Sequence, residues 1–369
     1  MNTFDDRPFI AIWELTRACD LVCLHCRAEA CKDRDPAELS TDEGKQLLDR
    51  LAAGGVPLVV LTGGDPAKRD DLVELVSYGT SRGLSMALTP SATPLVTDDL
   101  IRELAEAGLT RLAISIDGPD AAVHDAFRGI PGSFDSALRI LATARSLGLS
   151  TQINTSLHTA NIQLLPEFRS LVRTLAPTLW SVFVVVRTGR ATNSMVLSAE
   201  QVERLLENLA EASATESFAI KTTAAPHLRR VLLQQKKRDQ PARGRIAGWV
   251  NEGRGFMFVS HLGEVFPSGF LPVPCGNVRD RDPLDIYRDH PVFRALRDED
   301  AFSGKCGVCE YRKVCGGSRA RALSQGGDMF GSDPACAYIP PRYQGEPLKR
   351  THLKLFDRSS SGSDHDRQG

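Results

Sequence analysis

The sequence contains no apolar run long enough to cross a membrane and no excess of charge of either sign. A membrane-spanning helix needs about 20 consecutive apolar residues, and no stretch of these 369 residues approaches that length. The formal net charge is −1, so no broad field favours nucleic acid or an anionic membrane. The first ten residues lack a basic region followed by an apolar run, so we expect no secretory signal and a cytoplasmic protein.

Cysteine is absent from the whole central part of the chain. Of the nine cysteines, four lie between positions 19 and 31, and five lie between positions 275 and 336. Disulfides are rare in cytoplasmic proteins, and a disulfide framework would not leave such a gap. The distribution therefore favours two separate metal sites.

The first group contains three closely spaced cysteines, Cys19, Cys23 and Cys26, within a segment that we call the cysteine loop (residues 16–28). Four thiolates normally hold a cubane iron–sulfur cluster, so the spacing C-x3-C-x2-C indicates a cluster with one iron left open. Zinc is the competing interpretation, although structural zinc sites usually pair two C-x2-C knuckles. Cys31 lies outside this spacing, and we interpret it as a free thiol.

Short apolar segments alternate with amphipathic helical segments through the first two thirds of the chain. The predicted strands cover residues 8–15, 57–62, 85–90, 110–116, 150–157 and 180–186. Apolar strands separated by helices form parallel sheets with right-handed crossovers. The sequence therefore predicts an α/β fold, either an open doubly wound sheet or a partial barrel, with its site at the carboxyl ends of the strands. No GxGxxG follows the first strand, which argues against a dinucleotide fold.

Unusual segments follow three of these strands. They are the cysteine loop, the run Gly63-Gly64-Asp65-Pro66, and the polar pair Ser115 and Asp117. Because parallel strands end at one edge of the sheet, we expect these segments to lie together. Each has a simpler explanation when taken alone: a glycine turn before a helix, or a cap at a strand end.

Beyond about residue 225 the alternation stops. A basic helical connector is predicted for residues 228–245, a β-hairpin for 255–270 and a helix for 283–298. The last residues, 357–369, are polar and of low complexity, and we expect them to be disordered.

A second cysteine group follows the predicted helix. Its four members are Cys306, Cys309, Cys315 and Cys336, and the first three have the spacing C-x2-C-x5-C. Four thiolates can close a cubane completely. Zinc remains the alternative, because C-x2-C is also a zinc knuckle.

Together these motifs resemble the radical S-adenosylmethionine (SAM) superfamily over most of residues 8–345. The cysteine loop matches the family's C-x3-C-x-φ-C motif with His25 at φ, and GGDP matches its GGEP segment with Asp for the usual Glu. The C-terminal cysteines resemble the family's SPASM extension. The runs WELTRAC, CRAEA, HD-x-FRG, QINT and TGR are most similar to the enzymes of alternative haem b and haem d1 synthesis.

The resemblance implies a fold and two cofactors. The fold would be a partial (β/α)6 TIM-like barrel over residues 1–225, a SPASM-type domain over 226–345 and a disordered tail over 346–369. A [4Fe–4S] cluster on Cys19, Cys23 and Cys26 would bind SAM and cleave it to a 5′-deoxyadenosyl radical. The residues that match SAM contacts in the family are His25, Gly63, Gly64, Asp65, Pro66, Ser115, Asp117, Arg128 and Asn154. No catalytic side chain is assigned.

The resemblance also implies one auxiliary [4Fe–4S] cluster, held by Cys306, Cys309, Cys315 and Cys336. In the two-cluster pattern, a further cysteine occupies the position of Ser318, and the preceding hairpin supplies another where Ser268 stands. Cys275 remains nearby, but a cubane takes four ligands. We therefore predict a single auxiliary cluster, with the role of Cys275 open.

The expected function is the oxidative modification of a bulky substrate by radical chemistry. The motifs that are similar to those of the haem-synthesis enzymes favour a tetrapyrrole that loses CO2 from its propionates. A ribosomally made peptide is the alternative. An external one-electron donor such as flavodoxin or ferredoxin would be required. Arg187 and Arg190, after the sixth strand, are candidates to meet tetrapyrrole carboxylates, with a solvated turn as the other interpretation.

Two further hypotheses come from other classes. A non-catalytic iron–sulfur or metal-binding protein would also explain the cysteines, but not the glycine and Ser115–Asp117 segments at the same sheet edge. A zinc hydrolase is disfavoured because no histidine-rich metal triad is present. The sequence does not give the substrate, the electron donor or the oligomeric state.

Overall fold

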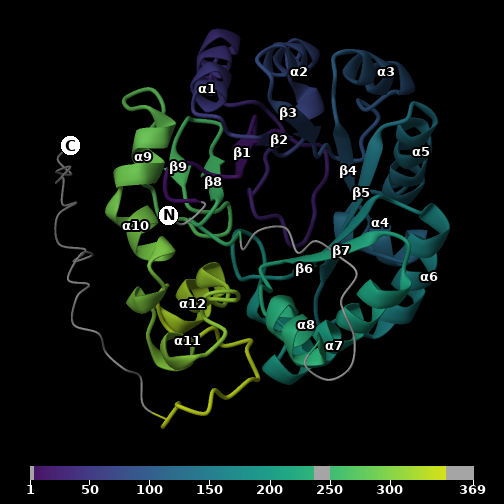
Figure 1. Ribbon diagram of the computed structural model, residues 1–369. Coiled ribbons are helices and arrows are strands. Elements are labelled where there is room, and N and C mark those ends of the chain that lie inside the picture. The colour runs from purple at the N-terminus through teal and green to yellow at the C-terminus, as the bar shows by residue number, and fades with distance from the viewer. Residues whose placement is uncertain (1–3, 237–249, 346–369) are drawn as a thin grey trace, which may run out of the picture.

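A curled parallel sheet organises the protein (Figure 1). The structure, a computed structural model, describes residues 4–236 and 250–345. Within these residues the strands run in the order β7-β6-β5-β4-β3-β2-β1-β8-β9, and every neighbouring pair is parallel except β8 with β9. The strands are β1 (Ile10–Glu14), β2 (Leu58–Thr62), β3 (Ser85–Leu88), β4 (Arg111–Ser115), β5 (Ser150–Leu157), β6 (Leu179–Val184), β7 (Ala219–Thr223), β8 (Phe256–Val259) and β9 (Val265–Phe266).

Helices connect the strands and lie outside the curled sheet (Figure 1). They are α1 (Thr41–Ala53), α2 (Leu72–Ser81), α3 (Asp98–Glu106), α4 (Ala121–Arg128), α5 (Ser133–Ser146), α6 (Leu165–Leu175), α7 (Ala199–Thr215) and α8 (Leu228–Lys236). The C-terminal part adds α9 (Pro283–Asp289), α10 (Pro291–Arg297), α11 (Gly304–Val308) and α12 (Arg319–Gly326). Among the described helices, none combines the length and the apolar character that crossing a membrane requires.

Local sequence explains where the longer helices begin. Ser40 accepts a hydrogen bond from the Glu43 backbone at 3.2 Å, and the Glu43 carboxylate accepts one from the Ser40 backbone at 2.8 Å. This capping box satisfies two backbone N–H groups that α1 would otherwise leave unpaired. Ser198 and Gln201 form the same arrangement at the start of α7.

The two faces of the sheet have different surroundings. Trp13, Leu61 and Trp180 are fully buried in the core between the sheet and the helices. Their strand neighbours alternate with them, and residues such as Ile12 and Val60 are only partly buried. Because side chains alternate between the faces of a strand, this second set lines the inner side of the curled sheet.

The six predicted strands correspond to β1–β6, and the predicted hairpin corresponds to β8 and β9. Two features were not predicted. Strand β7 has the largely polar sequence AIKTT and extends the sheet beyond β6, whereas β8 pairs in parallel with β1 and extends it at the other edge. The sheet therefore includes part of the predicted second domain, and the boundary near residue 225 stays a prediction.

Two details of the C-terminal half complete the comparison. The single helix predicted for residues 283–298 is divided into α9 and α10, because His290 has an extended backbone and Pro291 begins the second helix. The connector is helical to residue 236, and its remainder lies outside the described residues, as does the predicted disordered tail.

Candidate functional site

The cysteine loop leaves the carboxyl end of β1 and returns close to its starting point. The Cys19 backbone N–H donates to the Cys31 carbonyl at 2.7 Å, and the Cys31 N–H donates to the Arg17 carbonyl at 3.1 Å. The Cys31 thiol is exposed and donates to the Asp33 carbonyl at 3.2 Å. The backbone of Cys31 is thus hydrogen-bonded to the first part of the cysteine loop, and its thiol is hydrogen-bonded to Asp33, which lies outside that loop.

Each of the three loop sulfurs receives a hydrogen bond from an N–H group. The Leu21 backbone donates to Cys19 Sγ at 3.4 Å, the Ala30 backbone to Cys26 Sγ at 3.4 Å, and Arg128 Nη1 to Cys23 Sγ at 3.6 Å. Burial raises the pKa of the Cys19 thiol, which disfavours a free thiolate. Hydrogen bonds to sulfur are typical of iron–sulfur ligands and tune the potential of a cluster. The donor set therefore fits the predicted cluster ligands.

In the part of the chain that the structure describes, no three His, Cys, Asp or Glu side chains gather as ligands around a single metal ion. A zinc site needs all its ligands at about 2.0–2.3 Å from one ion. The assignment of Cys19, Cys23 and Cys26 to a cluster stays a prediction, supported by the hydrogen bonds to their sulfurs.

Gly63 and Gly64 lie directly against the cysteine loop. The Gly64 N–H donates to the Thr16 carbonyl and the Asp65 N–H to the Ala18 carbonyl, both at 2.7 Å. A Cβ on Gly63 would lie 2.5 Å from the Thr16 carbonyl oxygen, and a Cβ on Gly64 would lie 2.5 Å from that of Ala18. Only glycine permits this approach, so the pair holds the loop in place whatever ligand it also meets.

Asp65 is fully buried and serves neighbouring segments of the protein. Its Oδ2 accepts a hydrogen bond from Thr93 Oγ1 at 2.5 Å, and its Oδ1 accepts from the backbone of Ala67 at 3.2 Å and Ser91 at 3.3 Å. Burial raises the pKa of the Asp65 carboxyl. Pro66 is buried at the first position of the short helix that Asp65 caps. These contacts link the ends of β2 and β3.

Ser91 connects the run from Gly63 to Pro66 with the cysteine loop. The sequence analysis did not identify Ser91 as a site residue. Its hydroxyl donates to the Gly64 carbonyl at 2.6 Å and lies 3.4 Å from Cys19 Sγ. A serine in the loop after a strand has no distinctive sequence signal, so only the fold reveals the contact.

Asp117 and Arg128, both predicted SAM contacts, form an ion pair with each other. Asp117 is fully buried, and its Oδ1 accepts a hydrogen bond from the Ser156 backbone at 2.6 Å. Burial alone would raise the pKa of Asp117, but the Arg128 charge, the neighbouring His25 and His124, and the Ser156 hydrogen bond together hold the pKa below its usual range. Because Arg128 also donates a hydrogen bond to Cys23, the ion pair connects the end of β4 to the cysteine loop.

His25 belongs to a stack of three rings at the same end of the sheet. Its ring lies 4.2 Å from that of Phe127, which in turn lies 4.4 Å from His158 on its other face. Burial lowers the pKa of His25 to about 4, so the imidazole is neutral, and its Nε2 lies 3.2 Å from Ser156 Oγ. Phe127 was a missed member of the HD-x-FRG motif, between its histidine and arginine.

Ser115 and Asn154 lie side by side in the register of β4 and β5. Ser115 is partly exposed, and Asn154 Oδ1 accepts a hydrogen bond from Gln152 Nε2 at 2.7 Å. The structure thus brings all the predicted SAM contacts to the carboxyl ends of β1, β2, β4 and β5, as the parallel sheet requires.

A buried carboxylate at the end of β1, Glu14, was not predicted as a functional residue. It accepts a hydrogen bond from Arg27 Nη2 at 2.6 Å and lies 3.3 Å from His261 Nδ1. Burial would raise the pKa of Glu14, but the Arg27 charge and the hydrogen bonds lower it to about 2. Glu14 therefore connects the cysteine loop to the turn between β8 and β9.

The four C-terminal cysteines gather in a second region. Burial raises the pKa of Cys309, Cys315 and Cys336, and the nearby charge of Cys306 raises each of them further. Cys306 Sγ accepts a hydrogen bond from Arg319 Nη2 at 3.3 Å, and Cys315 Sγ accepts one from the Gly317 backbone at 3.5 Å. Cys306 thus acts on the pKa of the other three cysteines, and their assignment to one cluster stays a prediction.

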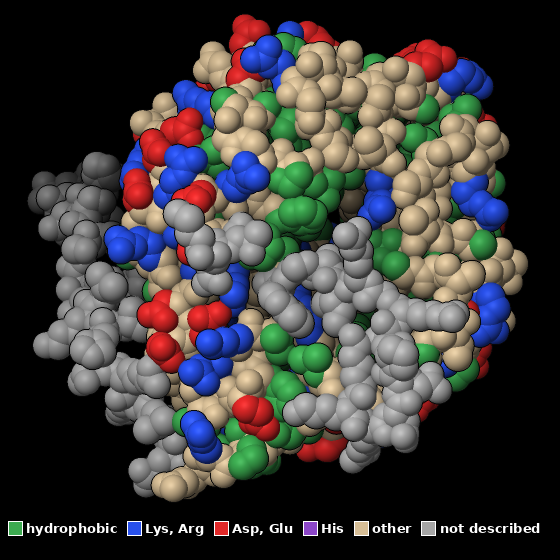
Figure 2. Space-filling view, in the orientation of Figure 1, with side chains coloured by type: hydrophobic (Ala, Val, Ile, Leu, Met, Phe, Trp, Pro, Cys, Tyr) green, Lys and Arg blue, Asp and Glu red, His purple; other side chains and the backbone are tan. Residues whose placement is uncertain are grey.

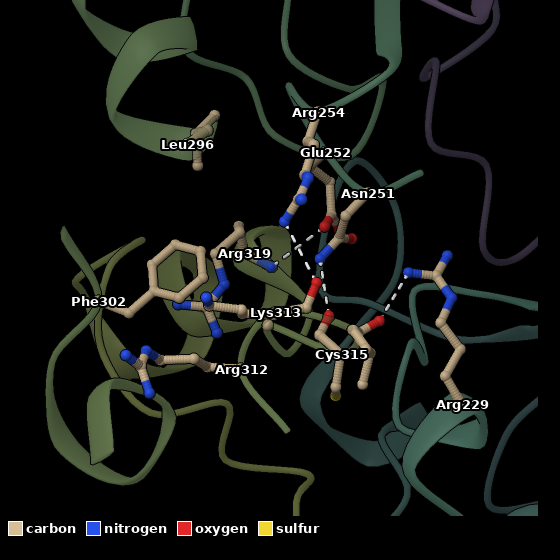
Figure 3. A pocket seen from close by; sticks show the side chains of 12 residues that line it. Arg229, Asn251, Glu252, Arg254, Leu296, Phe302, Arg312, Lys313, Cys315 and Arg319 are labelled. Carbon is tan, nitrogen blue, oxygen red and sulfur yellow. Dashed lines mark hydrogen bonds between the residues drawn. The ribbon is translucent and has the colours of Figure 1, made fainter. Parts of the chain in front are cut away.

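A small cavity of about 10 Å³ lies beside Cys315 (Figure 3). Asn251 points into this region and donates to the carbonyls of Cys315 at 3.2 Å and Gly317 at 2.9 Å, while Arg229 donates to the Val314 carbonyl at 3.1 Å. This volume has room for about one water molecule. The surrounding groups therefore hold the cysteine segment rather than a substrate.

Ser318 occupies the position of a missing fourth motif cysteine and is fully integrated in a polar network. Its hydroxyl donates to Glu252 Oε1 at 3.0 Å, and its backbone N–H donates to Asp333 Oδ2 at 2.6 Å. Ser268 accepts a hydrogen bond from the Phe270 backbone at 3.2 Å. Cys275 is buried in the main core, which raises its pKa to about 12. The number of auxiliary clusters stays a prediction.

Comparison with known proteins gives consistent findings. Residues 13–168 match the family described as the Radical SAM superfamily. The chain is 40% identical over 344 residues to an AdoMet-dependent heme synthase of Nitratidesulfovibrio vulgaris, covering 89% of this chain and 92% of that protein. It is 29% identical over 353 residues to an Fe-coproporphyrin III synthase of Methanosarcina barkeri, covering 90% and 88%.

A solved structure supports the fold. Streptococcus suis SuiB bound to the precursor peptide SuiA superposes with a TM-score of 0.71 at 18% identity, covering 90% of this chain and 76% of that chain. The predicted fold class, a partial barrel followed by a smaller C-terminal part, is confirmed by this likeness and by the curled parallel sheet.

Proposed function

Because this chain belongs to the radical SAM superfamily, we propose that it oxidises a haem-type tetrapyrrole whose propionate side chains lose CO2. The residues that would hold the radical cluster are Cys19, Cys23 and Cys26. When bound, the cluster and SAM supply a 5′-deoxyadenosyl radical that removes a hydrogen atom from the substrate, while the protein positions the reactants and excludes water.

One observation carries the choice of substrate. The similarity to a protein named AdoMet-dependent heme synthase extends over 92% of that relative, at 40% identity. The motifs in the first half of the chain shape the SAM site and say little about the substrate. Similarity that continues through the C-terminal half includes the residues that close the barrel, where a substrate would bind.

The inner side of the curled sheet suits a flat molecule with an apolar body and polar edges. Further along β1 and β2, toward their carboxyl ends, the register neighbours Ile12 and Val60 are apolar and partly exposed. The corresponding wall on β4 and β5 carries Ser115 and Gln152. Figure 2 shows several groups of hydrophobic side chains on this face, with Lys and Arg side chains between and around them. A tetrapyrrole ring with propionates has this amphipathic character.

The cofactor contacts of individual residues are part of the proposal. His25, Gly63, Gly64, Asp65, Pro66, Ser115, Asp117, Arg128 and Asn154 would line the SAM site, and an auxiliary [4Fe–4S] cluster would sit on Cys306, Cys309, Cys315 and Cys336. In the described structure, Asp65 and the Asp117–Arg128 pair are engaged with protein partners. We therefore assign them to shaping the site and leave direct SAM contact to the exposed edges around His25 and Ser115.

The reaction takes up one electron to cleave SAM and releases one electron when the substrate radical loses CO2. We propose that an external one-electron carrier of the flavodoxin or ferredoxin type supplies the first electron and, in its oxidised form, can accept the second. The test is anaerobic incubation of the reconstituted protein with SAM, dithionite and Fe-coproporphyrin III. We expect 5′-deoxyadenosine together with a tetrapyrrole that has lost CO2, both measured by mass spectrometry. A variant with Cys19, Cys23 and Cys26 changed to Ala is the control and should form neither product.

The outcomes separate the class from the substrate. SAM cleavage without change to the tetrapyrrole would overturn the substrate and revive the alternative, a ribosomally made peptide. A protein that takes up iron but neither binds nor cleaves SAM would instead be a non-catalytic iron–sulfur protein.

A further inference from the structure

The turn after β6 is in direct contact with the cysteine loop. Gly189 has a φ of +62°, a conformation that favours glycine, and a Cβ at this position would lie 2.5 Å from the Arg27 carbonyl oxygen. The backbone N–H of the next residue, Arg190, donates to the Cys26 carbonyl at 3.0 Å. The position of Arg190 is therefore fixed relative to the proposed radical cluster.

The guanidinium of Arg190 carries a charge without a partner. Its Nε and Nη2 atoms are buried and have no hydrogen-bond partner within residues 4–236 and 250–345. The residue as a whole is only partly buried, so an incoming ligand can reach the side chain. Burying a charged group without a partner is costly, which points to a missing anion.

Other arginines near the same loop are already paired. Arg27 donates to the Glu14 carboxylate at 2.6 Å, and Arg128 pairs with Asp117. Arg187, on the same turn as Arg190, donates to the Ser324 carbonyl and to Asn193 Oδ1. Arg128 Nε is also buried without a partner, but the Nη1 and Nη2 atoms of that guanidinium are bonded to Cys23 and Asp117. Arg190 differs because both of its buried nitrogens, Nε and Nη2, lack an acceptor among the described residues.

Within residues 4–236 and 250–345, no carboxylate accepts a hydrogen bond from Nε or Nη2 of Arg190. Asp117, the buried carboxylate that follows β4, is already engaged by Arg128 and by the Ser156 backbone.

We propose that Arg190 is a carboxylate receptor beside the radical cluster. Guanidinium is permanently charged and presents a planar fork of N–H groups that matches a carboxylate in two parallel hydrogen bonds. The inference rests on the proposed function for its ligands, because both SAM and a tetrapyrrole propionate bring a carboxylate to this place.

The test replaces the fork and measures the two ligands separately. Arg190→Gln removes the charge, and Arg190→Lys keeps a charge without the fork. SAM binding to the anaerobically reconstituted protein is measured by calorimetry, and Fe-coproporphyrin III binding is measured by absorbance titration without SAM. Losing charge-assisted hydrogen bonds should weaken one of these ligands by about tenfold to a hundredfold in the Gln variant, with the Lys variant in between.

For Arg187 the structure favours the solvated turn over the carboxylate contact, because the side chain is exposed and its guanidinium already donates to Asn193 Oδ1 and the Ser324 carbonyl. Arg187→Gln is therefore the matched control, which removes the same charge from the same turn. It should leave both affinities unchanged. Iron content and the circular dichroism spectrum of each variant verify that fold and clusters are intact. If Arg190→Gln loses its cluster, the comparison of Arg190→Lys with Arg187→Lys decides.

Each result has one meaning. Weaker SAM binding assigns the receptor to the SAM carboxylate, and weaker tetrapyrrole binding assigns it to a propionate. Unchanged affinity for both ligands overturns the proposal, as does an equal loss in Arg187→Gln, which would show a general charge effect. If the parent protein itself does not bind Fe-coproporphyrin III, the proposed substrate is wrong, and the SAM measurement alone decides the role of Arg190.

Discussion

Arg128 pairs with the buried carboxylate of Asp117 and, through the same guanidinium, donates to the sulfur of Cys23. One side chain thus joins the end of β4 to a proposed ligand of the radical cluster. The Asp117 carboxylate is held in turn by the Ser156 backbone on β5. The geometry of the cysteine loop therefore depends on an ion pair between two side chains of the protein itself.

Breaking this pair should destabilise the protein. Asp117→Asn leaves the Arg128 charge buried without its anion, and we expect the free energy of unfolding to fall by about 3 kcal/mol. Denaturant unfolding of the anaerobic protein measures the loss. In a double-mutant cycle, Arg128→Gln combined with Asp117→Asn should cost clearly less than the sum of the single changes. Strict additivity would show that the two side chains do not interact.

The buried histidine beside this pair makes stability depend on pH. Burial, and then the Arg128 charge, lowers the pKa of His124 from 6.5 to about 4. Between these values the unfolded chain binds more protons, so stability falls as pH falls from about 6.5 toward 4. His124→Gln should reduce the loss of unfolding free energy between pH 7 and pH 5 by about 2 kcal/mol.

Urea titrations at the two pH values test this expectation. Gln retains an acceptor for the Asp117 backbone N–H, which His124 Nδ1 accepts at 3.1 Å in the parent. The variant should therefore stay folded at pH 7. An identical pH dependence in the parent and the variant would show that His124 titrates normally in the folded state.

The sequence was sufficient to predict the sheet and the edge where its unusual residues gather. Short apolar strands between amphipathic helices leave few arrangements other than a parallel sheet, and parallel strands end at one edge. Strand β7 was missed because four of its five residues, in AIKTT, lack the large apolar side chains that identify a buried strand. Its residues are partly or largely exposed at the edge of the parallel part of the sheet.

The sequence alone could not predict which side chains contact each other. Asp117 and Arg128 were each predicted to meet SAM, and their ion pair depends on how α4 turns back after β4. Gly63 and Gly64 were predicted to approach a ligand, and the structure shows them against the carbonyls of the cysteine loop. Residue types indicate what a site needs, whereas the relative placement of separate segments decides which groups meet.

The contact between Gly64 and the cysteine loop leads to a prediction about cluster assembly. In Gly64→Ala the new methyl group would lie 2.5 Å from the carbonyl oxygens of Arg17 and Ala18, so the loop must move. We expect the variant to lose the radical cluster and about four irons per chain, and with them 5′-deoxyadenosine formation. Iron and sulfide analysis after anaerobic reconstitution measures the loss.

Gly326→Ala is the control for this experiment. A Cβ at Gly326 would have only the Ser332 carbonyl oxygen near it, at 3.9 Å, so iron content and SAM cleavage should match those of the parent. A Gly64→Ala protein with full iron content and normal SAM cleavage would show that the loop tolerates the displacement.

The last prediction is the number of clusters. In the C-terminal region Cys306 acts on the pKa of both Cys315 and Cys336, whereas Ser318 is hydrogen-bonded to Glu252 and Asp333. We therefore expect one radical and one auxiliary cubane, about eight irons per chain. Cys275→Ala should leave this number unchanged, because its thiol is buried in the main core and donates to the Val273 carbonyl.

Iron analysis with Mössbauer spectroscopy on the reconstituted protein decides between the possible counts. Twelve irons per chain, all in cubanes, would refute the single auxiliary cluster and make Cys275 a ligand. Four irons together with bound zinc would make the C-terminal cysteines a structural zinc site. A count near eight that falls to about four when Cys306 and Cys309 are changed to Ala, with SAM binding retained, would place the second cubane on the C-terminal cysteines.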